Sequence, residues 1–542
     1  MDIKVILAVV LSVLTLIVFQ YFSTKDVTPR TMDAAKQETR TLSKSKEVPK
    51  PPAVAEKTLQ MQPAGLSSAR DVIISTELYQ ATFTEFGGRL KSFKLKNYKE
   101  SILPGSPLKE LVKTEQPQEF PLEMSFGSNA ANGIESSLFK ADRYRIQLSS
   151  KDKEGSVSFT YDSPEGLRFV KRYTFYPRLY RIDLDGAVSN STPQALKADI
   201  ALSLLNRPYD KTDGYTFSGP AVYVDGKLHE IDLKDLKEPQ EFSGKVSWIA
   251  YEDRYFITAL APRAADPGDV RISRIGQQMT RASYVKPSFV VPAGGQNSFG
   301  YQLYIGPKDL SCIKQLEGLD KSIDFGWVNI IAKPFLLVLK IFNRFTYNYG
   351  LAIIVLTVLI KIVLWWPSQK SYQSMKQMQK LQPKLAKIRE KYKDDKQKMN
   401  EEIMSLYKTY KINPLGGCLP MVLQIPVFFA LYKVLLNAIE LRHAPLMLWI
   451  NDLSAPDRLP IGIDIPYLGG LPILTLLMGG SMFLQQWMTP TTGDPTQAKI
   501  MLLLPVIFTF MFVNFPAGLV LYWFVSNVLS IGQQYFVNKK AA

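Results

Sequence analysis

Cysteine, histidine and nucleotide-binding motifs are scarce or missing in this chain of 542 residues. Its two cysteines, Cys312 and Cys418, are too few for a disulfide framework, and the topology derived below separates them across a membrane or at its boundary. Its two histidines, His229 and His443, stand apart from any group with metal-ligand spacing, so no metal or other cofactor is expected. No G-x-x-x-x-G-K-[ST] loop is present, which indicates that the chain itself does not use ATP.

Acidic residues are missing from every long apolar run of the sequence. Paired aspartates for intramembrane proteolysis are therefore absent, and His443 falls in a polar loop, so a hydrolytic dyad is hard to assemble. We expect no catalytic residues and do not predict an enzyme. The net charge of +16 indicates contact with acidic lipid or RNA rather than sequence-specific binding to DNA.

The N-terminal apolar run covers residues 5–22, about the ~20 residues that a helix needs to cross a bilayer. It ends in F-Q-Y-F rather than in a small-x-small cleavage site, so residues 1–22 are predicted to form an uncleaved signal anchor. A cleavable signal peptide is the alternative. Residues 23–70 are rich in Lys, Thr, Ser, Ala, Gln and Pro, and this composition predicts a flexible linker.

Residues 71–325 change to short runs in which apolar and polar residues alternate, as in residues 156–161 and 271–273. Glycine and proline separate these runs at regular intervals. Such a pattern predicts a large antiparallel β-sandwich whose aromatic residues fill the core. We find no catalytic constellation in it, and nothing in the sequence specifies the sugar-binding face that a sandwich of this kind could carry.

The C-terminal part holds most of the long apolar runs and predicts a helical membrane core of five further spans. These spans are residues 348–367, 418–437, 468–488, 500–515 and 517–537, the last two joined by a tight turn. Residues 326–347 are amphipathic and carry three cations, Lys333, Lys340 and Arg344, close together. They are predicted to lie in the membrane interface, with a seventh full span as the alternative.

Loop charge sets the orientation of these spans. Between Trp366 and Cys418 the chain has twelve basic and five acidic residues, a net charge of +7, whereas the loop 438–467 has two basic and four acidic residues, a net charge of −2. The positive-inside rule places the first loop and the tail 538–542 in the cytoplasm and the second loop outside. The short loop 489–499 is then cytoplasmic, the N-terminus is cytoplasmic, and the sandwich lies outside.

Residues 368–417 are predicted to form a cytoplasmic helical hairpin that turns at residues 393–396. Apolar residues recur in it every three or four positions, among them Met375, Met378, Leu381, Leu385, Met399 and Ile403. Two helices alone bury little apolar surface, so the hairpin would be available to bind partners. A merely solvated basic face is the alternative.

One cation, Lys361, falls inside an apolar span. Charged residues in the membrane are costly and usually face a wet cavity or a protein interior, although a lysine can also extend to the interface. Thr357 lies one helical turn away on the same face, and Gln424 is a polar residue of the next span. We therefore predict a hydrated recess lined by these three residues; ordinary hydrogen bonding between helices explains most other polar residues of the spans.

Four motifs of this sequence are long and specific. They are N-P-L-G-G-C-L-P at residues 413–420, Q-I-P-V-F at 424–428, W-I-N-D-L-S at 449–454 and F-P-A-G-L-V-L-Y-W at 515–523. With them, essentially the whole chain resembles the YidC family of membrane protein insertases, in the arrangement of Gram-negative bacteria. The resemblance implies an inner-membrane location, a periplasmic supersandwich domain, and a hydrophilic groove closed toward the periplasm but open to cytoplasm and lipid. It also implies that the hairpin helps to receive substrate from the ribosome, the signal recognition machinery or the Sec translocon.

The resulting hypothesis is an insertase for nascent membrane proteins in the phospholipid bilayer. A polar flank is held by Lys361, Thr357 and Gln424 while the apolar segment slides along the outer faces of two spans into lipid. The slide residues are Leu423, Val427, Phe508 and Phe512. Two features depart from the family: the groove cation is usually arginine, and residues 455–470 form a longer loop for which we assign no role. The alternatives are a solute transporter, disfavoured because internal repeats are not seen, and an anchored carbohydrate-acting protein.

Overall fold

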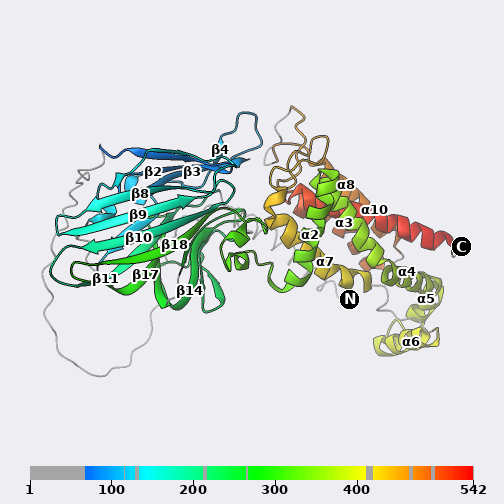
Figure 1. Ribbon diagram of the computed structural model, residues 1–542. Helices are drawn as coiled ribbons and strands as arrows, with labels where there is room; N and C mark the ends of the chain where they lie inside the picture. Colours follow the sequence, from blue (N-terminus) through cyan, green and yellow to red (C-terminus); the bar gives the residue numbers. More distant parts are fainter. Residues whose placement is uncertain are drawn as a thin grey trace, which may run out of the picture. The chain divides into compact units, whose positions relative to one another are not determined.

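The computed structural model describes residues 68–114, 116–127, 133–210, 216–263, 267–410, 419–462, 465, 468–489 and 495–540 (Figure 1). The signal anchor predicted at residues 1–22 and the linker up to residue 67 lie outside the described residues. So do Cys418 and most of the motif at residues 413–420.

The described residues between 71 and 307 fold mostly as β-strands in two sheets, which confirms the predicted β-sandwich. Their bounds are β1 (Asp71–Ser75), β2 (Tyr79–Thr84), β3 (Arg89–Lys99), β4 (Leu108–Glu110), β5 (Glu123–Phe126), β6 (Lys140–Ala141), β7 (Arg145–Gln147), β8 (Gly155–Asp162), β9 (Leu167–Phe175), β10 (Arg181–Asn190), β11 (Leu196–Asn206), β12 (Gly219–Val224), β13 (Lys227–Glu230), β14 (Gln240–Glu252), β15 (Phe256–Pro262), β16 (Pro267–Ile275), β17 (Met279–Val291) and β18 (Gln296–Pro307).

These strands form two sheets. One has five strands in the order β4-β3-β2-β1-β7, and the other has thirteen, with β5-β11-β17-β16-β14-β15-β18-β10-β9-β8-β6 as its main path. Neighbours are antiparallel except for β1 and β7. Successive side chains of a strand point to opposite faces of the sheet, so apolar and polar residues alternate along it. In β16, for example, Val270 and Ile272 are buried while Asp269 and Arg271 are exposed.

Aromatic residues join the two sheets, as the sequence predicted. Phe83 of β2 contacts Tyr173 of β9, with ring centroids 4.6 Å apart, and Phe159 of β8 at 6.2 Å. All three side chains have no exposed surface. Burying an aromatic side chain of this size contributes about 1.5–3 kcal/mol, so this layer of rings is a main source of the sandwich's stability.

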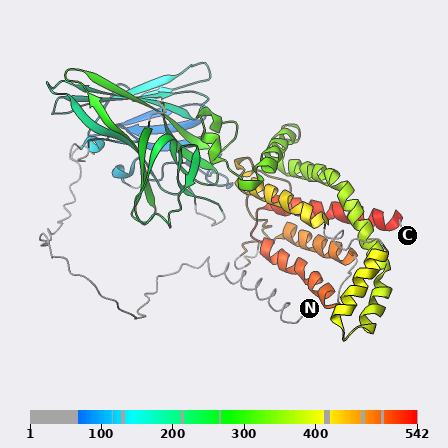
Figure 2. The same ribbon diagram turned by 90° about the horizontal axis from the view of Figure 1, so that it is seen from below.

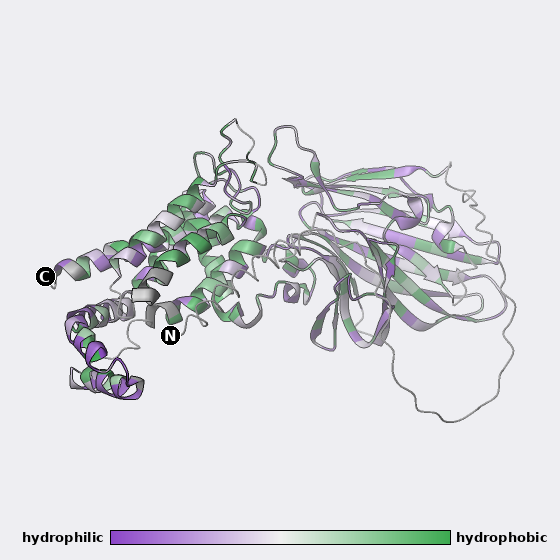
Figure 3. Cartoon of the chain, turned by 180° about the vertical axis from the view of Figure 1, so that it is seen from behind, coloured by the Kyte–Doolittle hydropathy of each residue, from purple (hydrophilic) through white to green (hydrophobic). Residues whose placement is uncertain are grey.

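After residue 326 the described part of the chain is mostly helical, apart from the loop between residues 438 and 472 (Figure 1 and Figure 2). The helices are α2 (Asn329–Thr346), α3 (Tyr349–Val363), α4 (Trp365–Lys380), α5 (Gln382–Lys391), α6 (Lys396–Thr409), α7 (Leu419–Asn437), α8 (Ile473–Met488), α9 (Pro495–Phe512) and α10 (Ala517–Lys540). In Figure 3 the helices packed together around α3 are mostly hydrophobic, whereas the hairpin helices α5 and α6 carry many hydrophilic residues.

The span predicted at residues 348–367 ends earlier than expected. Helix α3 stops at Val363, and α4 begins at Trp365 after a bend of 62°. Pro367 explains the break, because it lacks an N–H group and its ring would clash with the Val363 carbonyl in a continuous helix. Lys361 therefore lies in the last turn of α3 and not in the middle of a span.

The hairpin predicted at residues 368–417 consists of three helices, α4, α5 and α6, over the part that the structure describes. A proline near the start of α5, Pro383, accompanies the break after α4 at Leu381. The chain turns between α5 and α6 at residues 392–395, where the Asp395 carboxylate accepts a hydrogen bond of 3.0 Å from the Lys398 amide. This side chain caps the start of α6.

By length and apolar composition alone, one helix of the described residues, Gly326–Thr346, could cross a membrane unaided. The bent pair of α3 and α4 would make a second such segment, while α7 and α9 contain shorter apolar stretches, Val422–Asn437 and Met501–Phe512. Gly326–Thr346 is the segment that the sequence assigned to the membrane interface because of its three cations.

Candidate functional site

Lys361 has a neutral hydrogen-bond partner. Its Nζ donates to the Ser530 Oγ of α10 at 2.7 Å, and its side chain is half-buried. No carboxylate among the described residues forms an ion pair with it. A cation in the last turn of a helix interacts favourably with the helix dipole, so α3 itself helps to hold this charge.

Ser530 belongs to a line of polar residues on one face of α10, which we call the polar row: Tyr522, Ser526, Ser530 and Gln533. The spacing of four, four and three residues places them above one another on the helix. Their side chains are buried, with exposed fractions between 2% and 7%. Gln533 Nε2 donates to the Trp365 carbonyl at 3.1 Å, which connects the row to the bend between α3 and α4.

The structure does not bring all three predicted groove residues together. Thr357 is buried, and its hydroxyl donates to the Ile353 carbonyl of its own helix at 2.7 Å. Gln424 Nε2 donates to the Tyr522 hydroxyl, at the other end of the polar row from Gln533. Lys361 and Gln424 thus contact the same row, at residues that are eight positions or ~12 Å apart along the helix.

Ser530 and Gln533 were not predicted from the sequence. A serine or a glutamine in an apolar helix is by itself no evidence of a site, because such residues often bond between helices. The signal that could have found them is the helical spacing from Tyr522 to Gln533. Tyr372 of α4, which lies close to Ser530, was also missed.

The four predicted slide residues differ in exposure. Leu423, Val427 and Phe508 are half-buried, whereas Phe512 is 2% exposed and packs inward against Trp523, with ring centroids 4.5 Å apart. The outer faces of α7 and α9 are formed by other large apolar residues, namely Val422, Ile425, Phe429, Leu503, Val506 and Phe510.

The hairpin residues form a small apolar cluster. Met378, Leu381, Leu385 and Tyr407 are its buried members, and Ile403 packs against them. Met375 and Met399 are half-buried outside this cluster. The Lys384 ammonium lies over the Tyr410 ring at 4.5 Å, so lysine stems cover part of the remaining surface.

Residues 453–458 form hydrogen bonds with the ends of three helices, on the side of the helical region opposite the hairpin. The buried Asp457 carboxylate accepts hydrogen bonds from the Trp449 indole at 2.6 Å and from the Leu474 amide at the start of α8 at 2.5 Å. Arg458 donates to the Val513 carbonyl just after α9 at 2.8 Å. The Leu453 and Ala455 carbonyls accept from the first amides of α10.

These contacts give part of the 455–470 loop a role that the sequence did not suggest. A carboxylate at the start of a helix and a guanidinium at the end of another match the polarity of each helix dipole. The contacts also satisfy backbone groups that would otherwise need water. The loop therefore closes this end of α8, α9 and α10.

The sandwich contacts the helical region through a charged triad. Lys340 Nζ of α2 lies 3.1 Å from Asp309, just after β18, and 2.8 Å from Glu440, just after α7. Burial raises the pKa of Glu440 above its ordinary value, and the Lys340 ammonium opposes that shift. Lys340 is thus paired on both sides, unlike Lys361.

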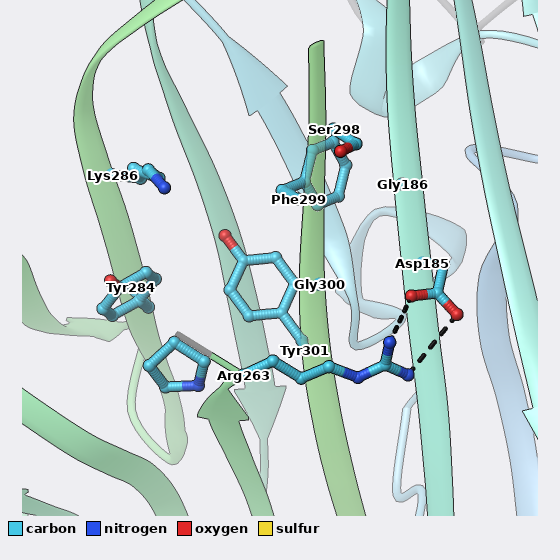
Figure 4. Close-up of a pocket in the computed structure, with 10 residues that line it drawn as sticks. Asp185, Gly186, Arg263, Tyr284, Lys286, Ser298, Phe299, Gly300 and Tyr301 are labelled. Atoms are coloured by element: carbon cyan, nitrogen blue, oxygen red, sulfur yellow. Dashed lines mark hydrogen bonds and ion pairs between the residues drawn. The ribbon is translucent and has the colours of Figure 1, made fainter. Parts of the chain in front are cut away.

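A cavity opens on the sandwich between β10, β15, β17 and β18 (Figure 4). Arg263 pairs with Asp185 through two contacts of 2.5 and 3.4 Å, and the Phe299 ring covers Gly186 so closely that a Cβ there would lie 1.9 Å from it. The buried Tyr301 hydroxyl lacks a partner among the described residues. The lining holds no nucleophile beside a base, and no cluster of metal ligands occurs in the described part of the chain.

Comparisons with known proteins cover the whole of this architecture. Residues 71–338 match the family described as "YidC periplasmic domain", and residues 341–542 match "60Kd inner membrane protein". The chain is 43% identical to the membrane protein insertase YidC of Syntrophus aciditrophicus over 556 aligned residues, 100% of each chain. It is 44% identical to that of Syntrophobacter fumaroxidans over 86% of each. A crystal structure of an active YidC insertase aligns with 86% of this chain and 92% of its own, at 18% identity and a TM-score of 0.37.

Proposed function

Because the chain belongs to the YidC family of membrane protein insertases, we propose that it passes polar flanks of nascent membrane proteins across the bacterial inner membrane and releases their apolar segments into the bilayer. The insertase names of its relatives favour this function over the transporter and carbohydrate alternatives.

The observation that carries the proposal is the unpaired charge of Lys361. Its described partner, the Ser530 hydroxyl at 2.7 Å, leaves the positive charge uncompensated. A carboxylate that enters a low-dielectric region alone pays a large desolvation cost, and an opposite charge reduces that cost. Lys361 can therefore hold the acidic flank of a substrate for a short time.

The polar row extends this site along α10. A flank that leaves Lys361 meets hydroxyl and amide groups down to Gln424 and Tyr522, ~12 Å further on. Thr357 contributes to the α3 side of this site, with its hydroxyl bonded within its own helix. We propose that these groups line the hydrated groove, and that the loop around Asp457 and Arg458 closes its periplasmic end. The flank then crosses a shorter low-dielectric path than the full bilayer.

The favourable partitioning of apolar side chains into lipid drives the apolar segment of the substrate into the bilayer. The segment slides along α7 and α9, past Leu423, Val427 and Phe508, whose neighbours on the outer faces are exposed and apolar. Each square ångström of apolar surface transferred from water contributes ~25 cal/mol. Phe512 lies beneath this path and supports it through Trp523.

The proposed topology follows the loop charges. Residues 1–22 act as a signal anchor, and α3, α7, α8, α9 and α10 form the five-span core, with α2 in the interface. Both termini and the hairpin are cytoplasmic, and the sandwich, a supersandwich in this family, is periplasmic. The basic hairpin receives substrate from the ribosome, the signal recognition machinery or the Sec translocon.

A photoreactive residue in α7 tests the route. At Gln424 it is expected to crosslink to a stalled nascent chain whose acidic flank has entered the groove. The matched position is Lys433, nine residues further along the same helix and exposed near its other end. Crosslinks at 424 and not at 433 support the route; equal yields at both positions, or none at 424, would contradict it.

A further inference from the structure

The turn at residues 446–450 displays two large apolar side chains. Met447 is 53% exposed and Leu448 is 80% exposed, although both follow a buried residue, Leu446. Leu448 also has φ of +58°, a backbone conformation that branched side chains rarely adopt. Exposure and strain are both unfavourable in water, so an exposed, strained leucine needs a physical reason.

The surrounding contacts impose this strained turn. The Leu446 amide donates to the Ile450 carbonyl at 2.9 Å, and the Ile450 amide donates to the Met447 carbonyl at 3.2 Å. Leu446 packs over Gly350 of α3, where a Cβ would lie 2.1 Å from its side chain. The turn is therefore fixed from both of its ends, and Met447 and Leu448 are held outward.

A second strained apolar residue lies beside this turn. Asn348 Nδ2 donates to the Leu446 carbonyl at 2.7 Å. Directly before Asn348 in the chain, Tyr347 ends α2 with φ of +51° and is 89% exposed, and Phe345 is 77% exposed. We call Phe345, Tyr347, Met447 and Leu448 the apolar rim.

We propose that the apolar rim is inserted into the interfacial layer of the outer leaflet of the phospholipid bilayer. Asn348 caps the start of α3, so the rim lies at the depth where this span leaves the membrane. Tyrosine is enriched at that depth, and the exposed Arg344 beside Phe345 suits an anionic headgroup. Four side chains offer far less than the ~1,200 Å² that a stable protein partner would bury.

This inference rests on the membrane topology proposed above but not on Lys361 or on a groove. It assigns the 438–467 loop a contact with lipid in addition to its contacts with helix ends. Because the rim comes from two segments that one hydrogen bond connects, its insertion would fix the outer end of α3 relative to α2 and the loop.

A fluorescent probe measures the insertion. Leu448→Cys is labelled with an environment-sensitive nitrobenzoxadiazole dye in a chain that carries Cys312→Ser and Cys418→Ser. The full chain is reconstituted into phosphatidylethanolamine and phosphatidylglycerol vesicles with lipids that carry a nitroxide high in the acyl chain. Leu103→Cys is the matched control, because Leu103 is a 67% exposed leucine at the tip of the β3–β4 turn of the sandwich.

The label at position 448 is expected to emit at shorter wavelength and to be quenched by the nitroxide lipids roughly two-fold more than the label at 103. Equal quenching at both positions overturns the proposal. A label at 448 that neither nitroxide lipid nor aqueous iodide quenches is covered by protein and also overturns it. Adding Lys361→Ala to the labelled chain separates the two proposals: quenching should persist while insertion of substrate is lost.

Discussion

The Lys361 ammonium and the Ser530 hydroxyl are joined by a hydrogen bond of 2.7 Å that connects the last turn of α3 to the middle of α10. The acceptor is neutral, so the bond orients the ammonium without compensating its charge. Ser530 in turn donates to the Ser526 carbonyl at 2.8 Å, which fixes the direction of its own hydroxyl.

Ser530→Asp is expected to inhibit insertion. A carboxylate at this position would pair with Lys361 and compete with the acidic flank of the substrate, lowering the yield of inserted acidic-tailed reporter by roughly ten-fold or more. Ser530→Ala is the control: it removes a hydrogen bond of about 1 kcal/mol but keeps the charge free, so insertion should stay near the wild-type level. Insertion of the reporter by proteoliposomes measures both. Full activity of Ser530→Asp would show that the free charge is not needed.

Asp457→Ala is expected to destabilise the helical region. The substitution removes the carboxylate that accepts from the Leu474 amide and the Trp449 indole, and loss of such a cap costs about 0.5–2 kcal/mol. The melting temperature of the detergent-solubilised chain should fall. Asp162→Ala is the control, because Asp162 and Arg168 form an exposed pair that solvent screens, so its loss should change stability little. Equal melting temperatures for the two variants would refute the capping role.

Gly350→Ala is expected to displace the turn at residues 446–450. Its Cβ would lie 2.1 Å from Leu446 Cδ1, and overpacking of this kind costs about 1–3 kcal/mol. Gly480→Ala in α8 is the matched control, since no atom lies within 4 Å of its added Cβ and alanine favours a helix by up to about 1 kcal/mol. Thermal unfolding should show opposite signs for the two variants. Stabilisation by both would mean that Leu446 does not pack on Gly350.

The stability of the sandwich is expected to depend on pH through Lys171. Burial, with a smaller contribution from the nearby Arg89, lowers the pKa of Lys171 from 10.5 to about 7. Between these values the unfolded chain binds a proton that the folded chain does not bind. The free energy of unfolding should therefore rise with pH across this window, by up to about 1.4 kcal/mol per unit, and lose that gain as pH falls toward 7.

Lys171→Met removes this titration. The full chain is unfolded with urea in detergent at pH 7, 8 and 9 and followed by tryptophan fluorescence. This gives the change in the free energy of unfolding with pH for each protein. The wild type should gain stability relative to Lys171→Met as pH rises, and the variant should be the more stable of the two at pH 7. Parallel pH profiles would show that Lys171 keeps its ordinary pKa in the fold.

The sandwich was predictable because the alternation of apolar and polar residues that indicates a strand lies within a short stretch of the chain. Alternation within a strand such as β16 identifies the buried face without knowledge of the partner strand. The bend at Leu364 was also within reach, since Pro367 is visible in the sequence, but the apolar side chains of Trp365 and Trp366 extended the predicted span past it. Hydrophobicity reports burial in lipid, and it does not report where a helix breaks.

The site was predictable only in part. A lysine within an apolar run is conspicuous, so Lys361 could be identified, whereas Ser530 lies 169 positions away in a helix that looks like any other apolar span. Gln424 and Thr357 were chosen as polar neighbours, yet both bond elsewhere, to Tyr522 and Ile353. Which polar groups meet depends on how helices far apart in the sequence pack, and one sequence carries no record of that.

The most direct measurement of the central claim compares Lys361→Ala with Lys361→Arg in proteoliposomes, using a small reporter with an acidic tail and a second reporter whose tail is neutral. Lys361→Arg keeps the charge and should insert both reporters. Lys361→Ala should fail with the acidic tail and retain most insertion of the neutral tail. Equal insertion of the acidic reporter by Lys361→Ala and the wild type would contradict the account.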